Sequence, residues 1–564
     1  METGEPFFWM KGILATQLAE VTTDPRRVDA GGFWAVAIDF EGNKRFARFT
    51  DIQRDLPFPP TENWIVLDAP WQSSIVQVAY ENYVMKIRTS IAEGSVYQVN
   101  ACRILTTPAP NISLAALFTR ILEANPSPFA SFLRLPDIEI ASASPELFLR
   151  REGLSVKTSP IKGTQRLSTA EEFGAKDQSE NIMIVDLMRN DLSRICEVGS
   201  VKVGALLRRE DHPGLRHLVS DVHGILKNDI TWGEIFEALM PPGSVSGAPK
   251  SSALELIAQC EAVPRGIYCG TLGWIEGDQS CLSVAIRTFW THSNFLYFGT
   301  GAGITWGSDP YGEWQETELK ANHLLGLAGG CDADGWQYGT GIFETVLVEN
   351  ARPLLFDQHM ERAEKSAQEL GITVPPREVI LEAIQAATSY PLARLRLSFG
   401  EIFSLAVNSY QQRNKPMCVQ ILDQVKQAGI GPHKQFPFHE NLEMLRATNA
   451  QGFDELLLID QSGAVGEGAT CNYVFYIQGE WVTPALRSGV LPGIMRALAL
   501  ENSLVTERNV RREDLVEVKS MMALSSLRIA SKVSELDGRH LDIGPHTEVL
   551  YEQLLGLARS DSVG

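Results

Sequence analysis

The chain has 564 residues, with 50 lysine and arginine side chains against 69 aspartate and glutamate side chains, and a formal net charge of −19. This length predicts several domains, each with a core of its own. Nucleic-acid binding needs clustered basic residues, so the acidic balance argues against a nucleic-acid partner. No apolar run approaches the roughly 20 residues needed to cross a bilayer, and the acidic N-terminus does not resemble a signal peptide. We therefore expect a cytoplasmic protein with no membrane partner.

The first part of the chain mixes strand-like runs with longer amphipathic stretches. Apolar runs and alternation predict strands at 32–38, 139–143 and 283–289. Helical spacing predicts helices at 71–93, 179–195, 251–260 and 313–327. This mixture is typical of an α+β domain.

A small, glycine-rich and polar segment at 328–336 is typical of a flexible linker. We therefore place one domain at 1–327 and a second at 337–564. The second domain is predicted to begin with a strand and a helix and to become strand-rich later, at 341–348, 356–370, 455–459 and 473–477. Periodicity alone indicates a second α+β or α/β domain.

Short segments of the first domain place reactive side chains beside residues that break regular structure. Ser144-Pro-Glu146 presents a carboxylate after a strand, and Pro160-Ile-Lys162-Gly presents a lysine between proline and glycine. The turn-rich run 240–250 opens a helix, where free N–H groups can meet an anion. Glycines in the run 299–303 let the backbone approach a ligand closely.

Acidic residues on two predicted helices are suited to a hard cation. Glu180 lies near the start of one helix, and Glu313 and Glu316 share one face of another because they are three residues apart. Carboxylates on separate helices can hold Mg²⁺ together with a substrate anion.

Together with the runs 97–100, 217–220, 265–268 and 286–288, these segments resemble the chorismate-utilising enzymes over about 90–325. The resemblance implies antiparallel sheets with surrounding helices, and chorismate as the substrate. It also implies Glu146 as a general acid, and Mg²⁺ held by Glu180 and Glu316 with support from Glu313. The residues that would bind chorismate are His217, Ser246, Tyr268, Arg287, Gly301, Gly303 and Lys320. A separate glutamine amidotransferase subunit is the partner expected to supply ammonia.

Lys162 distinguishes between two reactions of that family. Anthranilate synthases usually have alanine at this position, whereas the lysine form is seen in aminodeoxychorismate synthase component I. A lysine amine can attack C2 of chorismate, expel the C4 hydroxyl through the conjugated ring, and be displaced when ammonia arrives at C4. The resemblance therefore implies formation of 4-amino-4-deoxychorismate through a covalent lysine intermediate.

The second domain resembles the fold-type IV enzymes of pyridoxal phosphate (PLP) over about 338–545, through the runs 338–345, 359–362, 433–434, 466–472 and 489–496. This family builds two α/β-type lobes and commonly dimerises, so we expect a homodimer through this domain. The resemblance implies Lys434 as the Schiff-base lysine and proton carrier, and Glu467 beside the pyridinium nitrogen. The residues that would receive the phosphate are Arg362, Ile494, Met495 and Ser526.

The fusion favours two consecutive reactions. A lyase in the second domain would convert 4-amino-4-deoxychorismate into pyruvate and 4-aminobenzoate, the folate precursor. Two alternatives stay open, in which the second domain is an aminotransferase for an unrelated amino acid or a non-catalytic docking module for a glutaminase subunit.

Overall fold

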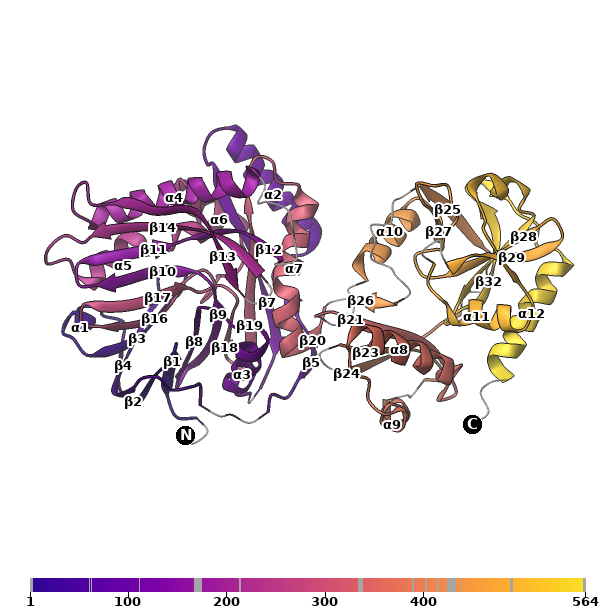
Figure 1. Ribbon diagram of the computed structural model, residues 1–564, viewed down its shortest axis with the longest axis horizontal. Helices are drawn as coiled ribbons and strands as arrows, with labels where there is room; N and C mark the ends of the chain where they lie inside the picture. Colours follow the sequence, from indigo (N-terminus) through magenta and orange to yellow (C-terminus); the bar gives the residue numbers. More distant parts are fainter. Residues whose placement is uncertain are drawn as a thin grey trace. The chain divides into compact units, whose positions relative to one another are not determined.

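The computed structural model describes residues 4–560 apart from 60, 62, 111, 167–174, 213–214, 333–337, 388–389, 401–402, 413–414, 424–432, 437 and 487–489. The chain divides into two compact units, Met1–Asp334 and Gly335–Gly564. This division lies within the segment 328–336 that the sequence predicts as a linker. Figure 1 shows the two units, coloured along the chain from indigo to yellow.

The first unit contains eighteen described strands joined into one sheet, which curls and is covered by helices (Figure 1). Its strands are β1 (Phe7–Met10), β2 (Ile13–Thr22), β3 (Phe33–Ile38), β4 (Lys44–Gln53), β6 (Gln72–Ser73), β7 (Gln98–Pro108), β8 (Phe129–Leu135), β9 (Ile138–Ser144), β10 (Leu147–Glu152), β11 (Ser155–Ser159), β12 (Ile161–Arg166), β13 (Lys202–His212), β14 (Leu215–Ile225), β15 (Gly247–Ala248), β16 (Thr271–Glu276), β17 (Gln279–Val284), β18 (Thr288–His292) and β19 (Phe295–Ile304). Its helices are α1 (Arg26–Asp29), α2 (Gln77–Ala92), α3 (Leu114–Ala124), α4 (Ala175–Ile195), α5 (Trp232–Leu239), the 3₁₀ helix η1 (Gly243–Val245), α6 (Lys250–Cys260) and α7 (Pro310–Ala328).

Antiparallel pairing brings distant motifs of the first unit to neighbouring strands. The long pair β7–β19 sets Asn100 opposite Gly303, and β15 sets Ala248 opposite Gln98. Strand β12 sets Lys162 opposite Leu218 of β14. The helix α4 packs on β12, β13 and β14, and α7 packs on β19 and α2. Apolar side chains from the sheet, α4 and α5 form one extended core beneath these motifs.

The second unit has two sheets, as the predicted two-lobed fold requires. The smaller one has the order β22-β21-β23-β24, with β26 beside β21, and the larger one has the order β27-β25-β32-β31-β28-β29-β30, with β33 beside β32. The strands are β21 (Gly341–Glu349), β22 (Arg352–Pro353), β23 (Leu392–Phe399), β24 (Phe403–Ser409), β25 (Met417–Asp423), β26 (Gln435–Phe436), β27 (Glu455–Ile459), β28 (Asn472–Ile477), β29 (Glu480–Pro484), β30 (Thr506–Arg508), β31 (Ser520–Ser525), β32 (Ile529–Leu536) and β33 (Arg539–His540). The helices are α8 (Phe356–Leu370), α9 (Arg377–Ala387), α10 (His439–Ala450), α11 (Ile494–Glu501), the 3₁₀ helix η3 (Arg512–Glu517) and α12 (Pro545–Ser560).

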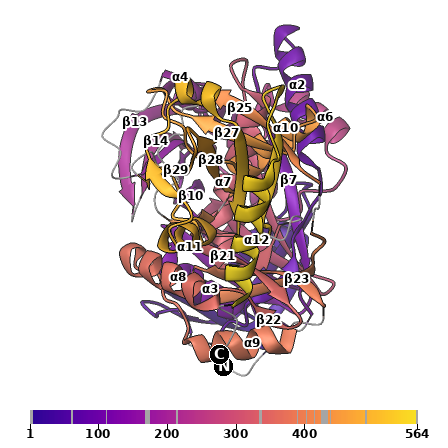
Figure 2. The same cartoon turned by 90° about the vertical axis from the view of Figure 1, so that its right-hand side faces the viewer.

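Helices cover one face of each sheet of the second unit. The helix α8 packs on β21, and α11 and α12 pack on β31. Figure 2 shows α12 lengthwise in yellow, with the strands of the larger sheet beside it. Among the helices that the structure describes, none combines the length and apolar composition needed to cross a membrane.

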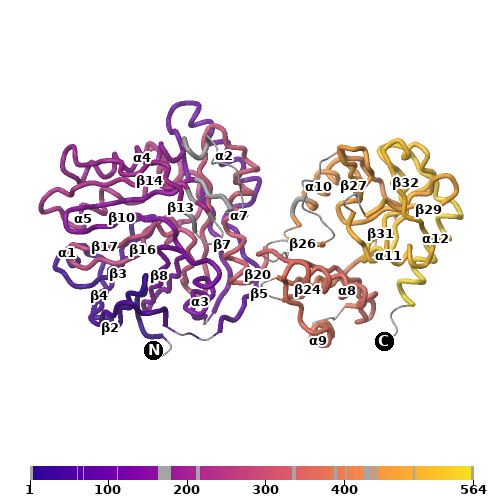
Figure 3. The backbone as a smooth tube through the Cα atoms, viewed as in Figure 1, coloured from indigo at the N-terminus to yellow at the C-terminus, as the bar shows by residue number. Residues whose placement is uncertain are grey.

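Three predicted segments differ from the structure. The helix predicted at 71–93 begins only at Gln77, because residues 72–73 pair with β7 as β6. The strand predicted at 283–289 is interrupted after Val284, because Arg287 adopts a left-handed φ of 52° that an extended strand does not allow. Part of the predicted linker is the strand β20 (Gly329–Cys331), which pairs in parallel with β5 (Leu67–Pro70), as the trace in Figure 3 shows.

Candidate functional site

The predicted acid of the first unit, Glu146, lies in a short turn between β9 and β10. Its backbone N–H donates to the Ser144 hydroxyl (3.2 Å), and that hydroxyl donates to the carbonyl of Val284 (2.6 Å). The Glu146 side chain is 4% exposed, and the Ser244 hydroxyl donates to its Oε1 (2.5 Å). The structure therefore fixes both the backbone and the side chain of this carboxyl group.

Burial raises the pKa of Glu146 to about 7, although the hydrogen bond from Ser244 and the charge of Lys162 both act to lower it. The electrostatic effect of Lys162 on Glu146 indicates that the predicted nucleophile and the predicted acid lie in the same region of the first unit. A carboxylic acid with a pKa near 7 has a large protonated fraction at neutral pH, as a general acid requires.

Lys162 also lies beside the glycine run of β19. A Cβ added at Gly303 would lie 3.5 Å from Lys162 Nζ and 2.7 Å from Gln98 Nε2, so Gly303 lets both side chains lie close to the backbone of β19. Gln98 is 1% exposed, and its Oε1 has no hydrogen-bond partner among the described residues. Sequence reasoning did not single out Gln98, because an uncharged amide in a strand gives no signal until pairing places it beside a lysine.

The predicted carboxylate clamp, Arg287, is half-buried between β17 and β18. Burial lowers the pKa of its guanidinium group, and no described carboxylate contributes to that shift. A cation that loses water without gaining a counter-ion is costly, so Arg287 is prepared to receive an anion. Tyr268, also predicted to bind chorismate, is buried against Gly299 of β19.

The helix α7 brings three further predicted residues to the glycine run. Lys320 Nζ donates to the Gly301 carbonyl (3.0 Å) and pairs with Glu316 Oε1 (2.6 Å). Glu313 lies one turn earlier and is 3% exposed. No group of three or more His, Cys, Asp or Glu side chains positioned for a metal occurs in the part of the chain that the structure describes. Mg²⁺ commonly uses only one or two protein carboxylates and completes its shell with water and substrate oxygens, so the carboxylates here fit Mg²⁺ only together with a bound anion.

The remaining predicted residues of the first unit have different surroundings. Glu180 is half-buried on α4. The Ser246 hydroxyl donates within its own loop, to the carbonyls of Pro242 (3.1 Å) and Gly243 (3.3 Å). His217 lies in β14 opposite Thr164, and its side chain is outside the described part of the chain.

In the second unit, Lys434 precedes β26 and faces β21. Its ammonium group lies 4.7 Å from the centre of the Phe343 ring, and its carbonyl accepts from the Phe343 N–H (2.9 Å). Burial lowers the pKa of Lys434 to about 8, with Arg362 and Arg396 acting in the same direction and nearby carboxylates opposing it. A substantial neutral fraction of the amine, which covalent attachment of a carbonyl cofactor requires, is thus present at neutral pH.

Two of the predicted cofactor residues, Glu467 and Arg362, act electrostatically on this lysine. Glu467 is 6% exposed, accepts from the Leu491 N–H (2.8 Å) and contributes to the electrostatic field at Lys434. Arg362 donates to the carbonyl of Pro492 (3.0 Å), just before α11, so its guanidinium lies at the helix N-terminus formed by Ile494 and Met495. Ser526 lies in the turn after β31, on which α11 packs. A near-neutral lysine, a buried carboxylate and a cation at a helix N-terminus are the donor set that PLP needs.

Glu344, which sequence reasoning left without a role, positions Arg362. The Arg362 guanidinium donates to both Glu344 oxygens (2.8 and 2.6 Å), and His359 Nδ1 lies 2.6 Å from Oε2. Burial opposes ionisation, but the neighbouring cations hold the pKa of Glu344 well below its usual range. Glu344 lies in the sequence run 338–345. Its role becomes visible only because α8 packs on β21 and brings His359 and Arg362 to this carboxylate.

Strand register places two further arginines on one face of β23, and one of them, Arg396, acts electrostatically on Lys434. Arg394 is paired with Leu347, and Arg396 with Thr345, in the antiparallel pair β21–β23. Directly opposed residues of such a pair point to the same face, which here also bears Phe343. The sheet face beside Lys434 is therefore basic.

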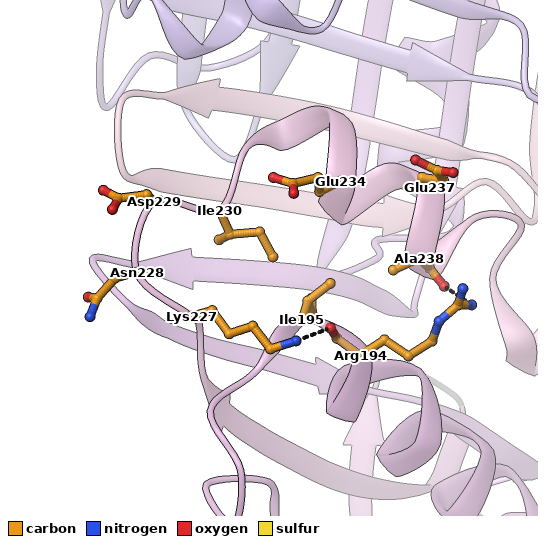
Figure 4. A pocket seen from close by; sticks show the side chains of 9 residues that line it. All are labelled: Arg194, Ile195, Lys227, Asn228, Asp229, Ile230, Glu234, Glu237 and Ala238. Atoms are coloured by element: carbon orange, nitrogen blue, oxygen red, sulfur yellow. Dashed lines mark hydrogen bonds between the residues drawn. The ribbon is translucent and has the colours of Figure 1, made fainter.

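A separate pocket lies elsewhere in the first unit. It has a volume of about 300 Å³ and is lined by residues of the α4 end, the 227–230 loop and α5 (Figure 4). Its cations bind backbone, since Lys227 Nζ donates to the Arg194 carbonyl (2.7 Å) and Arg194 donates to that of Ala238 (3.4 Å). None of the predicted site residues lines this pocket.

The first unit has a curled antiparallel sheet, and the second unit has two sheets and a lysine of lowered pKa. These folds are typical of chorismate-utilising enzymes and of fold-type IV PLP enzymes. The chain belongs to the chorismate binding enzyme family, whose sequence model matches residues 41–326, and the amino-transferase class IV model matches residues 341–536. The second match implies PLP as a cofactor. The two family resemblances and the two folds predicted from the sequence are thus confirmed.

Individual relatives resemble the first unit. An aminodeoxychorismate synthase component 1 from Salmonella typhimurium is 35% identical over 281 residues, which cover 47% of this chain and 61% of that protein. An anthranilate synthase component 1 from Saccharomyces cerevisiae is 34% identical over 292 residues, covering 49% and 57%. The chain thus spans about three fifths of the curated relatives it matches. The structure of anthranilate synthase component I from Streptococcus pneumoniae TIGR4 has a TM-score of 0.50 and 22% identity, and covers 57% of this chain and 93% of that one.

Proposed function

We propose that the first unit converts chorismate and ammonia into 4-amino-4-deoxychorismate and water, with Lys162 as a covalent nucleophile. The observation that supports this proposal best is the lysine itself, which lies between the glycine run of β19 and an acid with a pKa of about 7. The Lys162 amine attacks C2, the ring double bonds shift, and the C4 hydroxyl leaves as water after receiving a proton from Glu146. Ammonia then attacks C4, the double bonds shift back, and the bond between C2 and Lys162 breaks.

The neighbouring residues bind and orient the reactants in this proposal. Arg287 pairs with a carboxylate of chorismate, and Lys320 adds positive charge beside Gly301. The orphan Oε1 of Gln98 accepts a hydrogen bond from ammonia next to Lys162. Glu180, Glu313 and Glu316 are candidate ligands for Mg²⁺ once the substrate is bound. A separate glutamine amidotransferase subunit in the cytoplasm would supply the ammonia.

We further propose that the second unit removes pyruvate from 4-amino-4-deoxychorismate to give 4-aminobenzoate. PLP supplies an electron sink for the carbanion that proton removal creates. Lys434 removes the proton from the carbon that bears the amine, because its pKa of about 8 makes it an effective base near neutral pH. Glu467 holds a proton on the cofactor nitrogen, and Arg362 with the α11 N-terminus holds the phosphate. Arg394 and Arg396 suit a substrate that carries carboxylates.

The two proposals are tested together by supplying the full-length protein with chorismate, ammonium, Mg²⁺ and PLP and identifying the products by mass. We expect 4-aminobenzoate and pyruvate, and we expect Lys162→Ala to form neither 4-amino-4-deoxychorismate nor 4-aminobenzoate. Lys157→Ala is the matched control, because Lys157 lies on the adjacent β11 in an ion pair with Asp221 (2.9 Å) and should retain turnover. Anthranilate as the product, or unchanged turnover in Lys162→Ala, would contradict the first proposal.

A second candidate function for the C-terminal unit is transfer of an amino group from an unrelated amino acid. The class IV aminotransferase match supports it as well as it supports a lyase. A homodimer through this unit is compatible with either activity. Supplying 4-amino-4-deoxychorismate distinguishes the two, because a lyase releases pyruvate without a keto-acid acceptor whereas an aminotransferase requires one.

A further inference from the structure

Ser244 lies in the turn-rich loop between α5 and α6 and is held there tightly. It is the central residue of η1 and is 4% exposed. The preceding Gly243 packs directly on α4, since a Cβ there would lie 2.5 Å from Met188 Cε and 2.7 Å from Leu187 Cδ2. The Ser244 hydroxyl therefore has a defined position, 2.5 Å from Glu146 Oε1.

The hydrogen bond between Ser244 and Glu146 makes the two carboxyl oxygens unequal. A hydroxyl has one proton to donate, and Ser244 donates it to Oε1. A proton on Oε1 would compete with this donor, so the acidic proton is favoured on Oε2. Within the described part of the chain, Lys162 of β12 is the charged group that acts on Glu146. The other elements packed against Glu146 provide uncharged hydrogen-bond partners, which are the Ser244 hydroxyl of η1 and the Val284 backbone N–H at the end of β17.

We propose that Ser244 is a positioning residue for the acid step, which holds Oε1 of Glu146 so that Oε2 delivers the proton to the departing hydroxyl. This inference rests on the proposed function of the first unit for its role in catalysis. The hydrogen bond itself, which makes the two oxygens of the buried Glu146 carboxyl group unequal, does not depend on which reaction the unit performs.

The proposal predicts a change in the pH dependence of the rate when the Ser244 hydroxyl is removed. A hydrogen bond donated to a carboxylate stabilises the ionised form, so its loss raises the pKa of Glu146 toward the higher value that burial and Lys162 alone would set. An acid must be protonated to act, so the rate falls as pH rises through this pKa. Loss of the hydroxyl therefore moves the falling limb of the pH profile to higher pH, by about 0.5–1 unit.

The test compares full-length wild type with Ser244→Ala, Ser244→Thr and Ser283→Ala. Ser283 is the matched control, because its buried hydroxyl on β17 donates to the Leu272 carbonyl (2.9 Å) and not to Glu146. Chorismate consumption with ammonium is measured from pH 6 to 9, and kcat and KM are separated. In parallel, infrared titration follows the protonated carboxyl band that Glu146→Gln removes, which needs no turnover.

We expect Ser244→Ala to lower kcat about tenfold at the optimum, since the acid is no longer oriented, and to shift both the kinetic limb and the infrared midpoint upward. Ser244→Thr restores the hydroxyl and both midpoints, and Ser283→Ala leaves both midpoints in place. Lower kcat with an unchanged infrared midpoint would overturn the positioning role. A shifted infrared midpoint in a protein that forms no aminated product would support the role of Ser244 and overturn the proposed function.

Discussion

In each unit, burial moves the pKa of one predicted catalytic group toward neutrality. Glu146 rises to about 7 because its charged form loses water, and Lys434 falls to about 8 for the same reason. The two shifts have opposite signs because one group is anionic and the other cationic when ionised. Near pH 7 to 8 each group therefore exchanges its proton readily, as a catalytic acid or base must.

Arg287 combines features that a purely structural arginine would not need. Its φ of 52° is unfavourable for a side chain with a Cβ, and its half-buried guanidinium has no carboxylate that perturbs it among the described residues. Backbone strain and an uncompensated cation both cost folding free energy. Such features persist where a ligand supplies the compensation.

Arg287→Asn is therefore expected to weaken chorismate binding without destabilising the fold. Asparagine tolerates the left-handed backbone, and the uncompensated charge disappears. We expect KM for chorismate to rise at least about tenfold, as for loss of a charge-assisted hydrogen-bond pair, while the thermal midpoint stays equal or increases. Steady-state kinetics and thermal unfolding measure both quantities. Arg45→Asn, at an exposed ion pair with Asp137 (3.2 Å), is the control and should leave KM unchanged. A lower midpoint of thermal unfolding with an unchanged KM for chorismate would mean that Arg287 stabilises the fold and does not bind the substrate.

At the scale of elements, local patterns predicted several of the longer helices and some of the strands, but not how the strands pair. The helix α8 begins and ends as predicted at 356 and 370, because its amphipathic face is regular and Gly371 ends it in the left-handed region. The predicted start of α2 was wrong, because residues 72–73 pair with residues 105–106 of β7, more than 30 residues further along the chain. Short apolar runs give no information on such distant partners.

The same limit explains which site residues the sequence did not reveal. A charged residue such as Lys162 can be predicted as a site residue from a single sequence, because it lies between proline and glycine in an irregular segment. Gln98, Ser244 and Glu344 acquire their roles only through contacts with distant elements, which are β19, the 144–147 turn and α8. Register and packing, rather than residue type, determine these contacts.

The position of α7 depends on one buried side chain of β7. Arg103 is 2% exposed, donates to the Thr317 hydroxyl (2.9 Å) and to Glu318 Oε1 (2.5 Å), and lies 4.2 Å from the centre of the Trp314 ring. All three partners are on α7, which also presents Lys320 to the glycine run. Arg103 therefore couples the stability of this helix to the geometry of the site.

Arg103→Met is expected to lower the free energy of unfolding of the first unit by about 1–3 kcal/mol and to raise KM for chorismate. Methionine fills part of the volume but cannot donate to Thr317 or Glu318. Urea unfolding and kinetics at saturating Mg²⁺ measure the two effects. Arg54→Met removes an exposed pair with Glu276 (2.5 Å) and should change stability by less than about 1 kcal/mol. A loss of stability with unchanged KM would mean that the position of α7 does not affect chorismate binding.

At the scale of the whole molecule, the proposed reactions require an acidic protein to bind anions. The net charge of −19 would repel chorismate at long range, so each proposed site needs cations of its own. In the proposed mechanisms these cations are Lys162, Arg287 and Lys320 in the first unit, and Arg362, Arg394 and Arg396 in the second. Each unit also has hydrophobic core clusters of its own, on which its proposed site is built.

Independent sites predict that two defective chains complement each other. Lys434→Ala should accumulate 4-amino-4-deoxychorismate from chorismate and ammonium, because only the second reaction is lost. Lys162→Ala should release pyruvate from added 4-amino-4-deoxychorismate at the wild-type rate. A mixture of the two variants should then form 4-aminobenzoate after a lag, since the intermediate must diffuse between chains. Product analysis by mass over time measures the lag. Failure of the mixture, while each variant performs its remaining half-reaction, would mean that the intermediate passes only between units of one chain.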